Sequence, residues 1–135
     1  MHKALVIPVE GPITEIEVGR PGGGDLAVLQ EHVGGLIQAL PLPDFIRDAD
    51  KATGYVNEEG KFEPDCKPNM RATDFMVPGV GLFFGDYIAG TFILAGFNPR
   101  NGTHAELPQS VIDRARLIER EAGPSTPTQE SSDAE

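Results

Sequence analysis

The stretch from Pro78 to Leu107, PGVGLFFGDYIAGTFILAGFNPRNGTHAEL, holds the longest apolar run of the chain. This run extends from Tyr87 to Phe97 and is interrupted only by glycines and a threonine. The strand formers Phe92-Ile93-Leu94 lie within it, and turn-forming residues, Gly85-Asp86 among them, flank it. An apolar run of this length between two turn signals predicts a buried central strand rather than a helix.

Further strands are predicted before this run. Lys3–Val9 and Ile13–Val18 are expected to pair through a Gly-Pro turn, since apolar and polar residues alternate in the second segment. Pro8 indicates that the first strand lies at a sheet edge or ends there. The stretch Tyr55–Phe62 predicts a hairpin whose turn is Asn57–Gly60.

The first predicted helix covers Asp25–Leu40, with apolar residues at helical spacing and Asp25 as its N-cap. Pro41 ends it. The pair Gly34-Gly35 inside this helix destabilises it by about 1 kcal/mol per residue relative to alanine. Such a pair indicates either close approach of another backbone or a break in the helix at that point.

Two more helices are predicted. Met70–Met76 forms a short helix capped by Asn69, and its length makes it dependent on tertiary packing. Residues 109–122 form a longer helix with one apolar face, in which Ser110 and Asp113 have the spacing of a capping box.

These elements predict an α+β fold with a mixed, mainly antiparallel sheet. The amphipathic helices at residues 25–40 and 109–122 are expected to cover one face of this sheet. Residues 1–122 are expected to form a single globular domain. Residues 123–135 contain no large apolar side chain and are rich in Ser, Thr, Pro and acidic residues, which predicts a disordered acidic tail.

The formal net charge of −10 limits the partners of this chain. An acidic protein repels the phosphates of nucleic acids and anionic membrane surfaces, so direct binding to either is not expected. The same charge would suit a nucleic-acid mimic that competes for a basic partner, provided that carboxylates stand in rows at phosphate-like spacing. High acidity is more often simply a property of soluble proteins.

The cysteine and histidine content argues against a disulfide framework or a metal site. Cys66 is the only cysteine of the chain, which fits a reducing compartment. His2, His32 and His104 show no metal-ligand spacing, and no cofactor is expected. Neither a signal peptide nor a stretch of membrane-spanning length stands out, so we expect a cytoplasmic protein.

The main candidate for ligand binding is the predicted helix after Asn69. Asn69, Arg71 and Thr73 would lie on one turn, where an arginine and polar side chains can hold a carboxylate or a phosphate. Asn57, from the predicted hairpin, would complete the pocket. The simpler interpretation is that Asn69 caps the helix and Arg71 pairs with a surface acid.

Other segments offer less chemistry. The loop Arg20–Gly24 could present backbone N–H groups to an anion, but Asp25 occupies the position where that anion would sit. Asp86 could face a ligand, although Gly-Asp before a strand is more often a turn. An enzyme would need a pocket that gathers Asp86, His104 and Glu58, and no nucleophile motif is present, so we expect no catalysis.

A series of local signatures resembles a known family. The segments, in order, are Lys3–Val9, Val33-Gly34-Gly35, Tyr55–Lys61, Asn69–Thr73 and Gly85–Gly90. Together they resemble domain-of-unknown-function family 3846, a family of small acidic proteins carried by phages and plasmids, especially of actinobacteria. The resemblance covers residues 3–107. The sequence departs from the family pattern at Met70, where the family has proline, and in a polar insert around residues 48–53.

The resemblance implies a setting in a bacterial host and no particular activity. We therefore expect a non-catalytic accessory protein of a phage or mobile element that binds and modulates a host protein. The alternatives are a protein that binds a small anionic ligand, such as a nucleotide signal, and an acidic nucleic-acid mimic. Gly34-Gly35 and an exposed first strand would also suit a homodimer interface.

Overall fold

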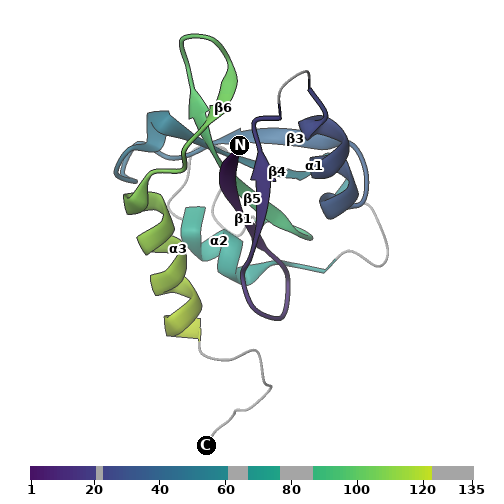
Figure 1. The fold of residues 1–135 in the computed structure, drawn as a ribbon. Coiled ribbons are helices and arrows are strands. Elements are labelled where there is room, and N and C mark those ends of the chain that lie inside the picture. Colours follow the sequence, from purple (N-terminus) through teal and green to yellow (C-terminus); the bar gives the residue numbers. More distant parts are fainter. Residues whose placement is uncertain (21–22, 61–66, 77–86, 123–135) are drawn as a thin grey trace, which may run out of the picture.

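The computed structural model describes residues 1–20, 23–60, 67–76 and 87–122, with side chains up to residue 119 (Figure 1). The chain has the expected α+β composition. Its strands are β1 (His2–Ile7), β2 (Thr14–Val18), β3 (Ile37–Pro41), β4 (Ala52–Asn57), β5 (Phe92–Asn98) and β6 (Thr103–Ala105). Its helices are α1 (Asp25–Val33), α2 (Met70–Met76) and α3 (Gln109–Ala122), with a short 3-10 helix η1 (Ala49–Lys51) before β4.

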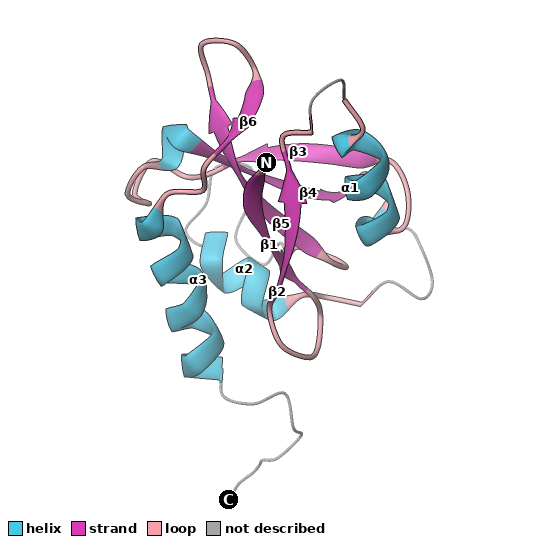
Figure 2. Ribbon diagram, in the orientation of Figure 1, coloured by secondary structure: helices cyan, strands magenta, loops and turns pink. Residues whose placement is uncertain are grey.

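The strand β5 lies in the middle of the sheet. The strand order is β2-β1-β5-β4-β3, and β6 pairs with the far end of β5 (Figure 2). Every pairing among the described strands is antiparallel. The side chains of Phe92, Ile93 and Leu94 are fully buried. The predicted central strand is therefore confirmed.

This central strand begins later than its apolar run. Gly90 has a left-handed φ of 79°, and its N–H donates to the Lys67 carbonyl at 2.8 Å. Ala89 forms a bridge with Pro68. The residues before Thr91 therefore pair with the segment that leads into α2, and only Phe92–Asn98 continues as β5.

The N-terminal hairpin forms as predicted. β1 and β2 pair from His2↔Val18 to Val6↔Thr14. β1 ends at Ile7, directly before Pro8, which has no N–H for the ladder. Because β1 lies between β2 and β5, Pro8 marks the end of a strand rather than a sheet edge.

The predicted helix Asp25–Leu40 consists of two elements. α1 ends at Val33 because Gly34 takes a left-handed φ of 83° and donates its N–H to the Gln30 carbonyl at 2.9 Å. The chain then continues as β3, which pairs with β4. The break at the glycine pair is confirmed, and a helix over residues 34–40 is wrong. The cap assignment is also wrong, since Gly24 occupies the N-cap of α1.

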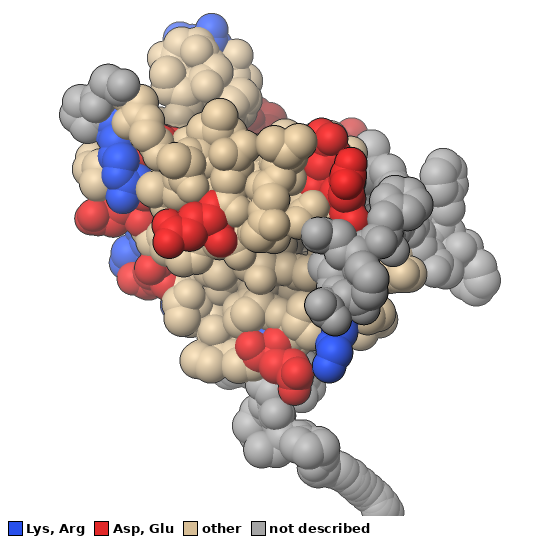
Figure 3. Space-filling model, turned by 90° about the vertical axis from the view of Figure 1, so that its right-hand side faces the viewer, with Lys and Arg blue, Asp and Glu red and all other residues tan. Residues whose placement is uncertain are grey.

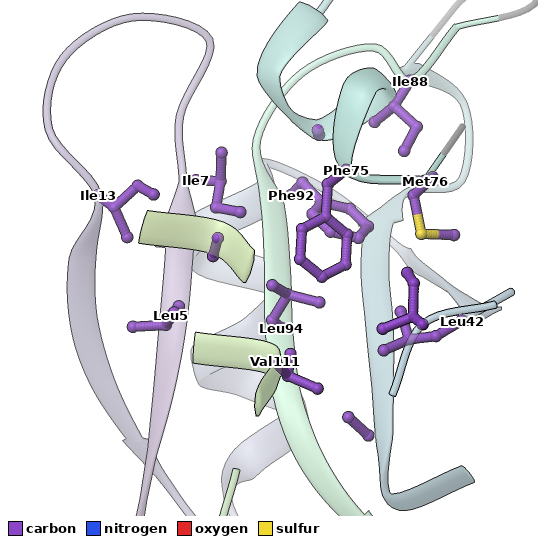
Figure 4. Close-up of a cluster of buried hydrophobic side chains, with 14 of the residues drawn as sticks. Leu5, Ile7, Ile13, Leu42, Phe75, Met76, Ile88, Phe92, Leu94 and Val111 are labelled. Atoms are coloured by element: carbon purple, nitrogen blue, oxygen red, sulfur yellow. The ribbon is translucent and has the colours of Figure 1, made fainter. Parts of the chain in front are cut away.

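The helices cover opposite faces of the sheet (Figures 1 and 2). On one face α2 and α3 pack together, and Phe75 lies against Phe92 with their ring centroids 6.3 Å apart (Figure 4). The members of this cluster are Leu5, Ile7, Ile13, Leu42, Ile46, Ala52, Val56, Ala72, Phe75, Met76, Ile88, Phe92, Leu94, Leu107, Val111 and Ala115.

On the other face α1 covers a smaller cluster. Its members are Ala4, Val6, Val18, Leu29, Val33, Ile93 and Ala95. The prediction that both amphipathic helices share one face is wrong. Successive residues of a strand point to opposite faces, and β1 and β5 are apolar at consecutive positions, so both of their faces need a cover.

The predicted cap of α2 forms, and the predicted cap of α3 does not. Asn69 Oδ1 accepts the Ala72 N–H at 3.0 Å, so the predicted cap of α2 is confirmed. The capping box of α3 is wrong, because Ser110 Oγ donates to Asp48 Oδ2 at 2.6 Å instead. α3 starts at Gln109, one residue before the expected cap, and this places Ser110 inside the first turn.

Several sequence predictions concern residues at or beyond the limits of the described chain. Tyr55 and Val56 belong to β4, and β3 and β5 occupy its two sides, so β4 is not the first strand of an isolated hairpin. Phe62, Cys66 and Asp86 lie outside the described residues, as does the predicted tail at residues 123–135.

Candidate functional site

Three of the four predicted binding residues, Asn57, Asn69 and Thr73, are buried, and the last two bond to the chain around α2. The Asn69 side chain is 0 % exposed, and its Nδ2 donates to the carbonyls of Ile7 and Gly90, each at 2.9 Å. Thr73 Oγ1 donates to the Asn69 carbonyl at 2.8 Å and accepts the Ile88 N–H at 2.9 Å. These bonds hold α2 against β1 and against the segment before β5.

The other two predicted residues lie apart from each other. Arg71 Nη2 donates to the Pro8 carbonyl at 2.6 Å, so its guanidinium binds backbone. Asn57 Nδ2 donates to the Val33 carbonyl at 3.2 Å, on the face that α1 covers. The structure thus brings Asn69, Arg71 and Thr73 together on α2, and places Asn57 on the opposite face of the sheet. The four side chains do not line a common pocket.

A polar cluster that the sequence analysis missed joins Asp25, His104 and Tyr55. His104 Nδ1 lies 2.7 Å from Asp25 Oδ2, and His104 Nε2 lies 2.8 Å from Tyr55 Oη. The rings of His104 and Tyr55 meet edge to face, with centroids 5.8 Å apart and an interplanar angle of 83°. The paired residues are 79 and 49 positions apart, so no local spacing could reveal this cluster.

The fold positions each member of the Asp25–His104–Tyr55 cluster. Tyr55 stands on β4 and packs against the apolar cluster beneath α1. His104 stands on β6, opposite Phe97 of β5. Asp25 is the first residue of α1. The cluster therefore ties the β6 strand and the start of α1 to the centre of the sheet.

Hydrogen bonds keep the Asp25 carboxylate ionised. Burial by itself raises the pKa of Asp25, but bonds from His104 and from the N–H groups of Gly19 (2.7 Å) and Arg20 (3.3 Å) outweigh burial and lower this pKa. Burial, with the negative charge of Asp25, raises the pKa of Tyr55. At neutral pH the cluster therefore contains a carboxylate and a protonated phenol.

A separate cleft of about 740 Å³ lies between η1, the β5–β6 hairpin and the start of α3. Its charged lining residues are Asp48, Asp50, Lys51, Arg100 and Glu106. The volume is in the range of small-molecule sites. None of the predicted binding residues lines this cleft, nor does any member of the Asp25–His104–Tyr55 cluster.

The outer side of β3 is a sheet edge among the described strands. The Glu58 N–H donates to the Leu36 carbonyl at 2.8 Å, which makes these residues a hydrogen-bonded pair. Since such pairs alternate along an antiparallel ladder, Ile37 and Ala39 turn their N–H and C=O groups outward. No residue of β3 is charged, and Leu36 beside it is 61 % exposed.

The opposite sheet edge, β2, has a different character. It carries Glu15 and Glu17, and Glu15 lies within ion-pair distance of Lys3 and Arg116. Charged side chains on an edge strand oppose the addition of another strand. β3 is therefore the edge that is better suited to pairing.

In the part of the chain that the structure describes, no helix is long and apolar enough to cross a membrane. No group of three or more His, Cys, Asp or Glu side chains in that part is placed to hold a metal ion.

The fold and these surfaces define a small α+β protein whose antiparallel sheet is covered by helices on both faces. The chain belongs to the family described as Domain of unknown function (DUF3846), which its sequence matches over residues 1–120. This match confirms the family resemblance of the sequence segments, and the family description assigns no activity. No curated protein and no solved structure matches the chain.

Proposed function

We propose that this chain is a non-catalytic accessory protein of a phage or mobile element that binds a host protein through its β3 edge. The outward N–H and C=O groups of Ile37 and Ala39, on a strand without charge, support this proposal. Extended segments of partner proteins add to such edges through main-chain hydrogen bonds. Proteins protect a sheet edge with charged side chains or proline; β3 has no charged residue, and its one proline, Pro41, stands at its end, beyond Ile37 and Ala39.

The surroundings of β3 define the chemistry of the partner segment. Leu36 offers an exposed apolar contact at the start of the strand. Glu58 and Glu59 are exposed just after β4, at the same end of the β3–β4 pair. We therefore expect an extended, mainly apolar partner segment with a basic residue at one end, since opposite charges speed and orient association.

The acidic side chains on the side of the molecule shown in Figure 3 give no support to nucleic-acid mimicry. On the side of the molecule that carries α1, acidic groups stand apart from one another around an uncharged centre (Figure 3). A mimic would instead need rows of carboxylates. This surface is better suited to a protein interface than to nucleic-acid mimicry.

The proposal is tested by recovering partners from a lysate of the bacterial host with the tagged full-length chain. We expect one stoichiometric host protein to be retained. Ala39→Pro removes the outward N–H and leaves the inward bonds to β4 in place, and Leu36→Glu puts a charge on the exposed apolar contact. Each variant should weaken binding at least about tenfold, which corresponds to roughly 1.4 kcal/mol.

Leu117→Glu is the matched control, because Leu117 is also an exposed leucine (46 %) but lies on α3. It should bind as the wild type does. Circular dichroism shows whether each variant remains folded. Recovery of no stoichiometric partner would refute the proposal, and so would undiminished binding by folded Ala39→Pro.

A small anionic ligand remains the second candidate; in the cleft it would contact Lys51 and Arg100, which stand beside Asp48, Asp50 and Glu106. A thermal-shift screen with nucleotides tests it. A ligand at about a hundred times its Kd stabilises the folded state by roughly 2.7 kcal/mol. If no nucleotide raises the unfolding temperature, this candidate fails.

A further inference from the structure

The hydrogen positions in the Asp25–His104–Tyr55 cluster follow from the charge of Asp25. An ionised carboxylate only accepts hydrogen bonds, and Asp25 already accepts the backbone N–H groups of Gly19 and Arg20. His104 must therefore donate from Nδ1. In neutral imidazole the other nitrogen then carries the lone pair, so His104 Nε2 accepts the hydroxyl proton of Tyr55.

This order of groups, carboxylate to imidazole to hydroxyl, is the arrangement that activates a hydroxyl nucleophile. The carboxylate orients the imidazole and stabilises its protonated form, and the imidazole takes the hydroxyl proton as the oxygen attacks. The phenol of Tyr55 is protonated at neutral pH, so it needs such a base to react. His104 Nε2 already lies 2.8 Å from the phenol oxygen.

The cluster is also partly exposed. The side chains of His104 and Asp25 are 12 % and 17 % exposed, and Tyr55 is half-buried. A polar group that only supports the core, such as Asn69, is fully buried in this chain. The Asp25–His104–Tyr55 cluster is therefore less enclosed than the polar groups of the core, and it has the order of groups of a reactive site.

We propose that Tyr55 is a nucleophilic hydroxyl that accepts an acyl group from an activated ester, with His104 as general base and Asp25 as a positioning residue. Tyr55 Oη attacks the ester carbonyl carbon while its proton moves to His104 Nε2. The bond between that carbon and the alcohol oxygen then breaks, and the departing alkoxide takes the proton from Nε2. The products are O-acylated Tyr55 and a free alcohol, and His104 is neutral again. This single transfer does not depend on partner binding at β3.

The experiment uses 4-nitrophenyl acetate as the ester and the intact full-length chain as the acceptor. Acetylation is followed by mass spectrometry of peptides that contain Tyr55 and Tyr87, the two tyrosines of the sequence. We expect Tyr55 to be acetylated at least about tenfold faster in the wild-type chain than in folded His104→Gln, since a positioned base typically adds a factor of about 10² or more. Tyr87→Phe should leave the Tyr55 rate unchanged.

A second readout separates chemistry from a merely structural role. In Asp25→Asn, a neutral amide stabilises protonated imidazole less than a carboxylate does. The midpoint of the pH profile of Tyr55 acetylation should therefore move to lower pH, with Arg20, which also faces Asp25, left in place. A midpoint that does not move contradicts the role of Asp25.

Absence of an acetyl group on Tyr55 of the wild-type chain would overturn the proposal. This measurement needs no variant, so it holds even where a substitution prevents folding. An unchanged Tyr55 rate in folded His104→Gln would overturn it as well.

Discussion

Asn69 shows that a residue with the chemistry of a ligand-binding side chain can belong to the core. Its N-cap role was predictable, because the cap and the helix are adjacent in sequence. Its bond to the Ile7 carbonyl joins residues 62 positions apart, and no local pattern contains that information. The Asn69 side chain, which the sequence suggests as a binding group, is hydrogen-bonded to backbone groups of the chain itself.

The substitution Asn69→Ala should therefore destabilise the fold strongly. It removes the hydrogen bonds that the Asn69 side chain makes to the carbonyls of Ile7 and Gly90 and to the N–H of Ala72, away from solvent. Each such group destabilises by about 1–3 kcal/mol, and these terms do not simply add, so we expect a loss of about 3 kcal/mol. Urea unfolding measures it.

The control for this substitution is the neighbouring Met70→Ala. Met70 is 55 % exposed at the start of α2, so its replacement should change the free energy of unfolding by no more than about 0.5 kcal/mol. Similar losses in the two variants would show that the Asn69 amide is not a structural link.

At the level of elements, the junction of β5 and β6 depends on Gly96. This residue pairs with Ala52 of β4 and with Ala105 of β6. A Cβ atom at Gly96 would overlap the carbonyl oxygens of Ala105 and Glu106, which are backbone atoms and cannot rotate away. In the sequence Gly96 only interrupts an apolar run, whereas in the fold it lets β6 approach β5.

Gly96→Ala should push β6 away from β5 and destabilise the chain by about 1–3 kcal/mol, the usual range for overpacking. The amides of Thr103–Ala105 should exchange hydrogen faster, and His104 should lose its bonds to Asp25 and Tyr55. Urea unfolding and hydrogen exchange measure these effects.

Gly35→Ala serves as the control for Gly96→Ala. The nearest atoms to a Cβ at Gly35 belong to the side-chain amide of Asn57, at 3.0 Å, so any strain would fall on the Asn57–Val33 hydrogen bond and not on β6. This variant should keep the wild-type exchange at β6. Unaltered exchange of Thr103–Ala105 in Gly96→Ala would contradict the proposed close approach.

The boundary between α1 and β3 also depends on a glycine. The apolar spacing of residues 25–40 suits a helix throughout, but the glycine at position 34 ends it. Residues 37–41 then pair with β4 instead of continuing the helix. The glycine pair indicates the break in the helix. It does not predict the strand that follows, because strand pairing depends on a partner elsewhere in the chain.

For the whole molecule, Asp25 links stability to pH. Its carboxylate joins the loop after β2, the start of α1 and β6. Hydrogen bonds lower its pKa in the folded state against the opposing effect of burial. The ionised carboxylate therefore stabilises the fold fully above the unfolded-state pKa of about 4, and this contribution disappears as the pH falls through the lower folded-state pKa.

Asp25→Asn should consequently be less stable than the wild type near about pH 7, and the difference should shrink below about pH 4. Urea unfolding at several pH values measures the two free energies. Asp44→Asn, at an exposed aspartate, should differ little from the wild type at each pH. A difference between Asp25→Asn and the wild type that stays constant with pH would contradict the assigned role of Asp25.

The sequence by itself determined the family, the central strand, the N-terminal hairpin and the helices at Met70–Met76 and Gln109–Ala122, because periodicity, caps and turns are local properties of the chain. The tertiary structure alone decided that α1 and α3 lie on opposite faces, that β3 is an uncharged edge, and that Asp25, His104 and Tyr55 meet. The physical reason is sheet register. Which distant side chains become neighbours depends on how strands pair, and that pairing is settled only when both faces of the sheet are buried at once.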